Sequence, residues 1–310
     1  MGVIEAVGER RVRNLRYVAE RRGFLAALLI SPAVLFIGLL VGVPFALAVY
    51  LSFTDATAGS LTGKWVGVQN FTSELHDPIF RGALWHTFLF TVISQAVVIV
   101  LAGLLAHALV RSFRGRWLLR FVILLPWAAP IALTAIGFLW FYDPQASIFT
   151  WILERVHLAS AANPPNWLGT PRAAMSSIIT VQAWRTIPFA TVIFIAGISS
   201  IPQEVDDAAA MDGATGLRKL WYVSLPLQLP IALVAVLFGI VFTATDMVVP
   251  YILTNGGPFN STQVLTTWAF QTGINAGNVG QGAAIALFML PFLAAVVVGM
   301  LFFARRAEVT

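Results

Sequence analysis

Arg185 and Asp246 are the only formal charges well inside the apolar blocks of this sequence, and they are its first candidates for chemistry. A charged side chain at the centre of a bilayer costs about 2.5–3.5 kcal/mol on insertion scales, so each must face a partner or a water-filled cavity. Counted at about 1.5 Å per residue from the polar ends of their blocks, the two lie at depths that differ by roughly 6 Å. An ion pair between them is therefore within reach.

Further candidates share a helical face with these charges. They follow at i, i+3, i+4 and i+7 in one block and at i, i+4 and i+7 in the next: Gln182, Arg185, Thr186 and Phe189, then Gly239, Thr243 and Asp246. A face that combines hydrogen-bonding groups, an aromatic ring and a glycine suits a neutral, polyhydroxylated solute. The alternative is an Arg185–Asp246 pair that only ties two helices together.

The elements that must position these residues are membrane helices. The 310 residues are 58% hydrophobic and 11% charged, whereas soluble domains carry about 25% charged residues. The apolar residues form blocks long enough to cross a hydrocarbon layer about 30 Å thick. Alternating strands of a membrane barrel are absent, so the spans must be helices. We expect an all-α, polytopic membrane protein with six spans in one domain, 24–304, at residues 24–53, 84–110, 118–142, 175–199, 229–253 and 283–304.

Lys and Arg predict the orientation of these spans, because basic residues concentrate in cytoplasmic segments. They cluster in the tail before the first span, in the loops after the second and fourth spans, and after the last span: Arg10, Arg11, Arg13, Arg16, Arg21, Arg22, Arg111, Arg114, Arg116, Arg120, Arg218, Lys219, Arg305 and Arg306. The opposite loops hold few basic residues. Both termini, a basic tail at 1–23 and a short one at 305–310, are therefore predicted to be cytoplasmic.

Several kinds of chemistry are excluded or disfavoured by what the sequence lacks. There are no cysteines, so disulfides and thiolate metal sites are excluded. No G-x-x-x-x-G-K-[ST] phosphate loop is present, the four histidines are not clustered as metal ligands, and no nucleophile with its base is recognisable. The basic residues do not form a stripe with aromatics, which argues against nucleic-acid binding. We expect a chain that is not an enzyme and holds no metal or cofactor.

The predicted cytoplasmic loop at 201–226 is longer than a chain reversal needs. Pro202 opens a short Ala-rich helix with acidic residues in its first turn, which suits the positive end of the helix dipole. Gly213 permits a sharp turn, and a second amphipathic helix is expected at 215–222. An apolar face on a cytoplasmic loop helix calls for a protein partner.

This loop resembles the hallmark of ABC importer permeases of the carbohydrate-uptake group, typified by maltose and glycerol-phosphate permeases. That hallmark runs acid-Ala-Ala, two or three residues, Gly, nine residues, Ile or Val, one residue, Leu-Pro. The matching residues are Asp207-Ala208-Ala209, Gly213, Val223 and Leu225-Pro226. The acid is Asp where the family usually has Glu, and Leu220 stands where an aromatic residue is common. Weaker matches to the group are Trp65-Val66-Gly67-Val68-Gln69-Asn70-Phe71, Ser52-Phe53-Thr54-Asp55 and Asn255-Gly256-Gly257-Pro258.

The resemblance implies a type I ABC importer permease fold and a role for the loop. In this family the loop docks into a cleft on a separate ATPase, so that Asp207 would pair with a basic ATPase residue and Gly213 would set the angle between the two short helices. The coupling residues implied are Asp207, Ala208, Ala209, Asp212, Gly213, Ala214, Leu217, Leu220, Val223, Leu225 and Pro226. The same stretches of spans four and five line the solute site in maltose-type permeases. The resemblance therefore assigns solute binding to the seven residues around Arg185 and Asp246.

The resemblance also implies partners and a location. The chain would pair in the bacterial cytoplasmic membrane with a second, homologous permease, two copies of an ATPase that binds ATP and Mg, and an extracellular solute-binding protein. The expected solute is a sugar, with a disaccharide such as trehalose or maltose favoured. Alternatives are a permease for a glycerol phosphate diester or a polyamine, and an ion-coupled secondary carrier. The carrier is disfavoured because only one acid is buried and no inverted repeat is detectable.

Overall fold

The computed structural model describes residues 22–307 except 61, 146 and 161–163; the side chains of 22, 24, 217 and 304–307 are also outside the description. Most of the predicted basic N-terminal tail therefore lies outside the described residues, as do the side chains of Arg305 and Arg306. The chain forms two compact units, Met1–Leu51 and Ser52–Thr310. Apart from the isolated bridges Thr54–Trp65 and Thr57–Ser60, the described regular structure is helical, which confirms the predicted all-α class.

The first unit consists of helix that is apolar on all sides. It comprises α2 (Arg22–Ile37), the π-helical turn η1 (Gly38–Gly42) and most of α3 (Val43–Ser52). Together they form a 28-residue candidate span, Leu25–Ser52, which agrees with the predicted first span to within one residue at each end. Only 6% of its most apolar window is buried, as expected of a helix whose solvent is lipid or another chain.

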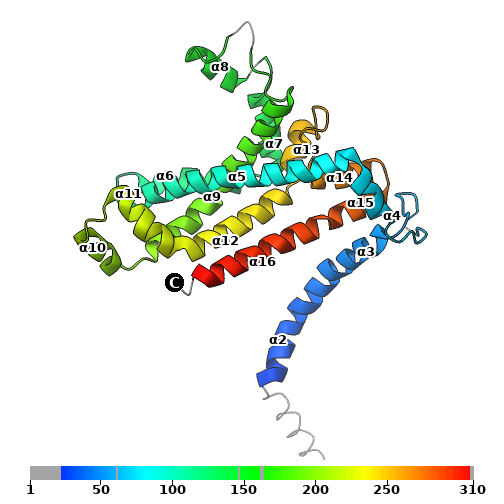
Figure 1. Cartoon of the computed structure of the whole chain (residues 1–310), viewed down its shortest axis with the longest axis horizontal. Coiled ribbons are helices and arrows are strands. Elements are labelled where there is room, and N and C mark those ends of the chain that lie inside the picture. Colours follow the sequence, from blue (N-terminus) through cyan, green and yellow to red (C-terminus); the bar gives the residue numbers. More distant parts are fainter. Residues whose placement is uncertain (1–21, 61, 146, 161–163, 308–310) are drawn as a thin grey trace, which may run out of the picture. The chain divides into compact units, whose positions relative to one another are not determined.

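The second unit is a bundle of long helices joined by short ones. Its elements are α4 (Gln69–His76), α5 (Pro78–Val110), α6 (Arg116–Ala128), α7 (Ile131–Phe141), α8 (Ile148–Arg155), α9 (Pro171–Ser199), α10 (Gln203–Met211), α11 (Gly216–Lys219), η2 (Leu220–Ser224), α12 (Leu225–Ala244), α13 (Val248–Thr254), α14 (Leu265–Phe270), η3 (Gln271–Asn275), α15 (Val279–Leu287) and α16 (Met289–Ala307). In Figure 1, α5, α12 and α16 run alongside one another, with α10 and α11 at one end and α4, α14 and α15 at the other.

Within the described residues, five helices are long and apolar enough to cross a membrane, and a bent pair makes a sixth candidate. The predicted third span is wrong as a continuous helix: α6 and α7 meet at an angle of 98°. Pro126 and Pro130 lie at the bend, and each removes a backbone donor from the helical ladder. The predicted fifth span is also interrupted, because α12 ends at Ala244 and α13 begins at Val248.

Small residues bring the central helices together. One buried cluster at the contacts of α5, α9 and α12 is rich in alanine: Val98, Ala102, Ala106, Ala183, Ala190, Phe194 and Ala235. Without a strong hydrophobic drive in lipid, such close approach supplies the van der Waals contact that holds membrane helices together. This contact fixes the spacing of α9 and α12, which carry most of the predicted solute site, and of α5 beside them.

The ends of α5 are fixed by side chains. Asp77 caps its first turn, since its Oδ1 accepts hydrogen bonds from the backbone N–H of Ile79 at 2.6 Å and of Phe80 at 3.2 Å. At the other end, Arg120 Nη2 donates to the carbonyl of Leu109 at 2.9 Å and satisfies one orphan acceptor. The longest helix of the bundle therefore begins and ends at defined positions.

A buried carboxylate holds α4 against the end of the bundle. Glu74 is fully buried and accepts hydrogen bonds from Trp268 Nε1 at 2.9 Å and from Gln281 Nε2. Burial raises the pKa of the Glu74 carboxyl above its ordinary value, an effect that these two hydrogen bonds partly offset. Glu74 thus joins α4 to α14 and α15 through a buried acid.

Candidate functional site

The predicted ion pair is present. Arg185 Nη2 lies 2.7 Å from Asp246 Oδ2, and the two side chains are 15% and 3% exposed. Asp246 sits in the break between α12 and α13, where its second oxygen accepts the backbone N–H of Val249 at 3.2 Å. The break between α12 and α13 has a local cause, because Pro250 has no N–H to donate to the Asp246 carbonyl. The Asp246 carboxylate then satisfies a free donor in the first turn of α13.

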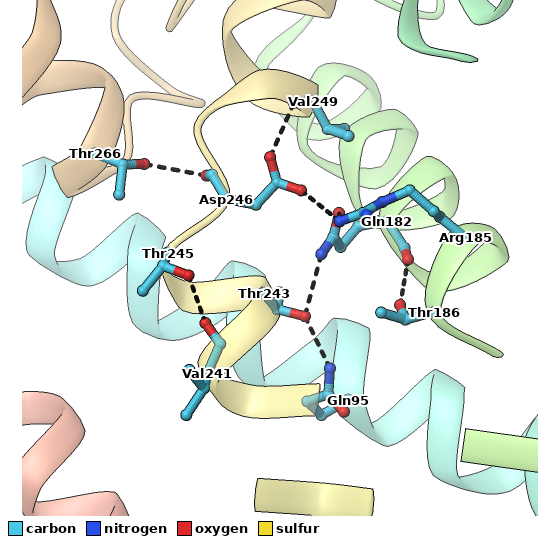
Figure 2. A network of polar contacts seen from close by, with 10 residues as sticks. All are labelled: Gln95, Gln182, Arg185, Thr186, Val241, Thr243, Thr245, Asp246, Val249 and Thr266. Carbon is cyan, nitrogen blue, oxygen red and sulfur yellow. Dashed lines mark hydrogen bonds and ion pairs between the residues drawn. The ribbon is translucent and has the colours of Figure 1, made fainter. Parts of the chain in front are cut away.

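The hydrogen-bonding residues around this pair bond to one another (Figure 2). Gln182 Nε2 donates to Thr243 Oγ1 at 3.3 Å, and Arg185 Nη2 is 3.5 Å from Gln182 Oε1. Thr186 donates to the carbonyl of Gln182. Gln182, Thr186 and Thr243 are at most 1% exposed. Within this chain, the predicted hydrogen-bonding groups are therefore brought together and bond to one another, except that the buried Nε of Arg185 has no hydrogen-bond partner.

Gln95 on α5 belongs to the same network, and the sequence analysis missed it. Its Nε2 donates to Thr243 Oγ1 at 2.8 Å, and the residue is only 4% exposed. A Cβ built on Gly239 would lie 2.2 Å from Gln95 Oε1, so the space that Gly239 leaves is taken by this amide. The available signal was the polar pair Ser94-Gln95 in the middle of an otherwise apolar block.

Phe189 lies in a cluster of four rings instead of standing alone. It stacks on Trp127 with centroids 4.9 Å apart and meets Phe242 edge-on at 5.6 Å. Phe238 completes the cluster at 6.1 Å from Phe189. Trp127 is 37% exposed and Phe238 46% exposed, so the cluster presents an accessible aromatic surface. Phe238 and Phe242 were detectable as an i, i+4 aromatic pair, but the contact of Phe242 with Trp127, at 5.7 Å between ring centroids, depends on how α6 packs in the bundle.

The charges in this site balance. The Arg185 guanidinium and the Asp246 carboxylate neutralise each other, and the remaining partners are neutral amides, hydroxyls and rings. Among the described residues, no three His, Asp or Glu side chains gather closely enough to hold a metal ion. The exposed rings of Trp127 and Phe238 offer a stacking surface to a ligand that carries no strong charge, while the buried amides and hydroxyls bond to one another.

The loop at 201–226 has the expected first helix and a different second one. α10 covers Gln203–Met211, and the turn that follows contains Gly213 at φ +73°. The second helix does not end near residue 222 as predicted. α11 continues through η2 into α12 without interruption, because nothing between Gly216 and Leu225 breaks a helix and Pro226 falls in the first turn of α12, where a proline fits.

The predicted coupling residues are distributed over this loop with different exposures. Asp207 is exposed, and its Oδ1 accepts a hydrogen bond from Gln203 Nε2 at 3.0 Å. Ala209 is buried. The other described members are exposed or partly exposed: Ala208, Asp212, Gly213, Ala214, Leu220, Val223, Leu225 and Pro226. The side chain of Leu217 lies outside the described residues.

Comparison with known proteins places this architecture. A family model described as binding-protein-dependent transport system inner membrane component matches residues 98–309. The chain is 30% identical over 266 residues to the sulfoquinovosyl glycerol transport system permease protein of Agrobacterium fabrum, covering 86% of this chain and 85% of that protein. It is 32% identical over 223 residues to the trehalose/maltose transport system permease protein of Thermococcus litoralis, covering 72% of this chain and 74% of that protein.

A solved structure shares the fold. A chain of a bacterial ABC transporter involved in the import of the acidic polysaccharide alginate superposes with a TM-score of 0.78 at 18% identity, covering 94% of this chain and 99% of that chain. At this identity the likeness concerns the fold alone. It agrees with the helical bundle described above.

Proposed function

Because the chain belongs to the family of inner-membrane components of binding-protein-dependent transport systems, we propose that it forms half of the translocation pathway of an ATP-driven importer for a neutral sugar. The chain is a multi-pass transport subunit. One relative is named for trehalose and maltose, which are neutral disaccharides, and the other for sulfoquinovosyl glycerol, whose sulfo group is acidic, so only the first supports a neutral solute. We favour a disaccharide such as trehalose or maltose as the solute.

The charge balance of the site is the observation that carries the choice of a neutral sugar. A glycerol phosphate diester needs an unpaired cation, but Arg185 is already paired with Asp246 at 2.7 Å. A polyamine needs unpaired acids, but the carboxylate of Asp246 is already paired with Arg185. The exposed rings of Trp127 and Phe238 offer a stacking surface for the apolar face of a sugar ring.

The remaining parts of the proposal concern partners and sidedness. A second permease chain would complete the pathway, two ATPase copies would bind ATP and Mg, and an extracellular solute-binding protein would deliver the sugar. The loop from Asp207 to Pro226 would dock into the ATPase on the cytoplasmic side, with Asp207 exposed toward a basic residue there. Both termini would be cytoplasmic. No cofactor is assigned to this chain.

The test is solute-stimulated ATP hydrolysis by the assembled complex. The complex of both permeases, the ATPase and the solute-binding protein is reconstituted and offered trehalose, maltose, a glycerol phosphate diester and putrescine in turn. We expect stimulation by trehalose or maltose and none by the phosphodiester or the polyamine. Stimulation by either charged solute alone would overturn the assignment of a neutral sugar.

A further inference from the structure

The coupling loop contains an ion pair that the family signature does not include. Lys219 Nζ lies 2.9 Å from Asp206 Oδ1, and the two side chains are 31% and 33% exposed. Asp206 is on α10, directly before the signature acid Asp207, and Lys219 is the last residue of α11. The neighbouring acids therefore point to different partners: Asp207 is exposed and bonded within its own helix, while Asp206 reaches across to the next helix.

The backbone between these two residues is built to bend. Gly213 and Gly216 have φ of +73° and +56°, in the left-handed region that favours glycine. A Cβ at either position would meet nothing within 4 Å, so glycine is needed there for its backbone conformation and not for space. A turn with two such residues is a weak transmitter of force from α10 to α11.

Packing behind the loop is also loose. A hollow of about 390 Å³ lies between the loop and the ends of α5 and α9. Its lining includes His107 of α5, Arg111 directly after α5, Ile198 of α9, and both members of the ion pair. The pair spans the side of this hollow and connects α10 to α11 where close side-chain packing does not.

Lys219 is connected to the solute site by an unbroken run of helix. At the two ends of η2, Lys219 and Leu225 have right-handed helical dihedrals, φ −60° with ψ −42° and φ −62° with ψ −47°, so that α11, η2 and α12 form one continuous helical rod, which contains the π-helical turn and Pro230. Thr243 stands near the far end of this rod, about 36 Å from Lys219 at about 1.5 Å per residue. A displacement of Lys219 is therefore transmitted toward the residue at which Gln95 and Gln182 meet.

We infer that Asp206 and Lys219 form a strut, which bridges the glycine turn and transmits movement of α10 to the rod that carries Thr243. The inference rests on the proposed docking of α10 against an ATPase and names two positioning residues for that coupling. An exposed ion pair contributes little to stability. Removing the strut therefore leaves the fold and ATPase binding intact while loosening the link between ATP hydrolysis and transport.

The experiment measures labelled trehalose transported per ATP hydrolysed, in proteoliposomes that contain the whole complex. The variants are Asp206→Asn, Lys219→Gln and the reversed pair Asp206→Lys with Lys219→Asp. Glu204→Gln, an exposed acid of the same helix, is the matched control. We expect each single variant to lower the ratio roughly threefold to tenfold, within the range of about twofold to thirtyfold that known coupling energies span, with ATPase co-purification unchanged. The reversed pair restores most of the ratio and the control keeps it.

Four outcomes contradict the strut or the proposed function. Single variants with the wild-type ratio, or a reversed pair as defective as the singles, overturn the strut. Loss of ATPase co-purification in both single variants also overturns it, because the residues would then be part of the docking surface. A wild-type complex that transports no trehalose and binds no ATPase contradicts the proposed function itself.

Discussion

At the scale of single residues, the amide of Gln95 and the missing side chain of Gly239 depend on each other. Gln95 Oε1 occupies the place of a Cβ on Gly239 and the Gln95 amide also holds Thr243. The site is therefore shaped by α5 as much as by the two helices that the sequence analysis singled out. This dependence makes a pair of substitutions informative.

Gly239→Ala is expected to destabilise the folded protein by about 1–3 kcal/mol, because a methyl group forces Gln95 out of a packed position. Gln95→Ser in the same chain removes the collision and restores most of the loss. The control is Gly137→Ala, also within a helix, where a Cβ meets nothing within 4 Å. Thermal unfolding of the purified complex measures all three variants. Equal losses in the single and double variants contradict the predicted contact.

Arg185 and Asp246 can be tested both as a structural pair and as a solute site. Removing one partner leaves a buried charge uncompensated, which costs about 3–5 kcal/mol, so we expect Asp246→Leu alone to be more damaging than Asp246→Leu combined with Arg185→Met. Stability of the variants by thermal unfolding checks this order. If the double variant folds and keeps its apparent affinity for the sugar, Arg185 and Asp246 do not bind the solute. Their role is then only to hold the two helices together.

The seven residues predicted around these charges were reachable because helical spacing places them on two faces, and the structure brings those faces together. Gln95, Trp127 and Phe242 were not predicted. Their place in the site depends on which helices pack side by side, and this is not encoded in the spacing within a single block.

At the scale of elements, the sequence predicted where the apolar segments lie but not where their helices are interrupted. Mean hydropathy over a window depends on the side chains and not on the direction of the helix axis. It therefore could not predict the 98° bend between α6 and α7. The prolines at the bend were visible, but prolines in membrane helices are also tolerated as mild kinks. The break after Ala244 is followed by Pro250, which has no N–H to donate to the Asp246 carbonyl. Pro250 was visible in the sequence, whereas the hydrogen bond from Val249 to the Asp246 carboxylate was not.

The attachment of α4 is expected to weaken as pH rises. The folded-state pKa of Glu74 lies above its ordinary value of 4.5, so the unfolded chain releases this proton first. The contribution of Glu74 is fully present below pH 4.5 and is lost as pH rises through the raised folded-state value. Glu74→Gln, which keeps an acceptor for Trp268, removes this dependence. Unfolding temperatures of both proteins across that range test the prediction, and identical slopes contradict it.

At the scale of the whole molecule, composition and basic-residue bias predicted a six-span helical protein, and the family match confirms the predicted type of permease. The family was identified in the sequence mainly from the residue spacing of one loop, 201–226. We expect that spacing to be specific to the family because the loop is proposed to dock on a partner. Sidedness remains a prediction, because no element of the fold by itself distinguishes the two membrane faces.

The absence of cysteine makes sidedness directly measurable. Met211 in the coupling loop is 89% exposed, and Phe259 in the loop after α13 is 93% exposed. In cells whose outer membrane has been permeabilised, we expect a membrane-impermeant maleimide to label a Phe259→Cys chain. A Met211→Cys chain should be labelled only after the cytoplasmic membrane is dissolved with detergent. Labelling of Met211→Cys in intact membranes would place the coupling loop on the wrong side for an ATPase.

The central claim is that hydrolysis of ATP by a partner, acting through the loop from Asp207 to Pro226, drives a sugar past this chain. The most direct measurement is uptake of labelled trehalose and maltose into proteoliposomes that contain the complete complex, with ATP supplied to the ATPase and no ion gradient. The account predicts uptake that requires ATP and is lost in Asp207→Lys. Uptake that proceeds without ATP, or that follows an imposed ion gradient, would contradict it.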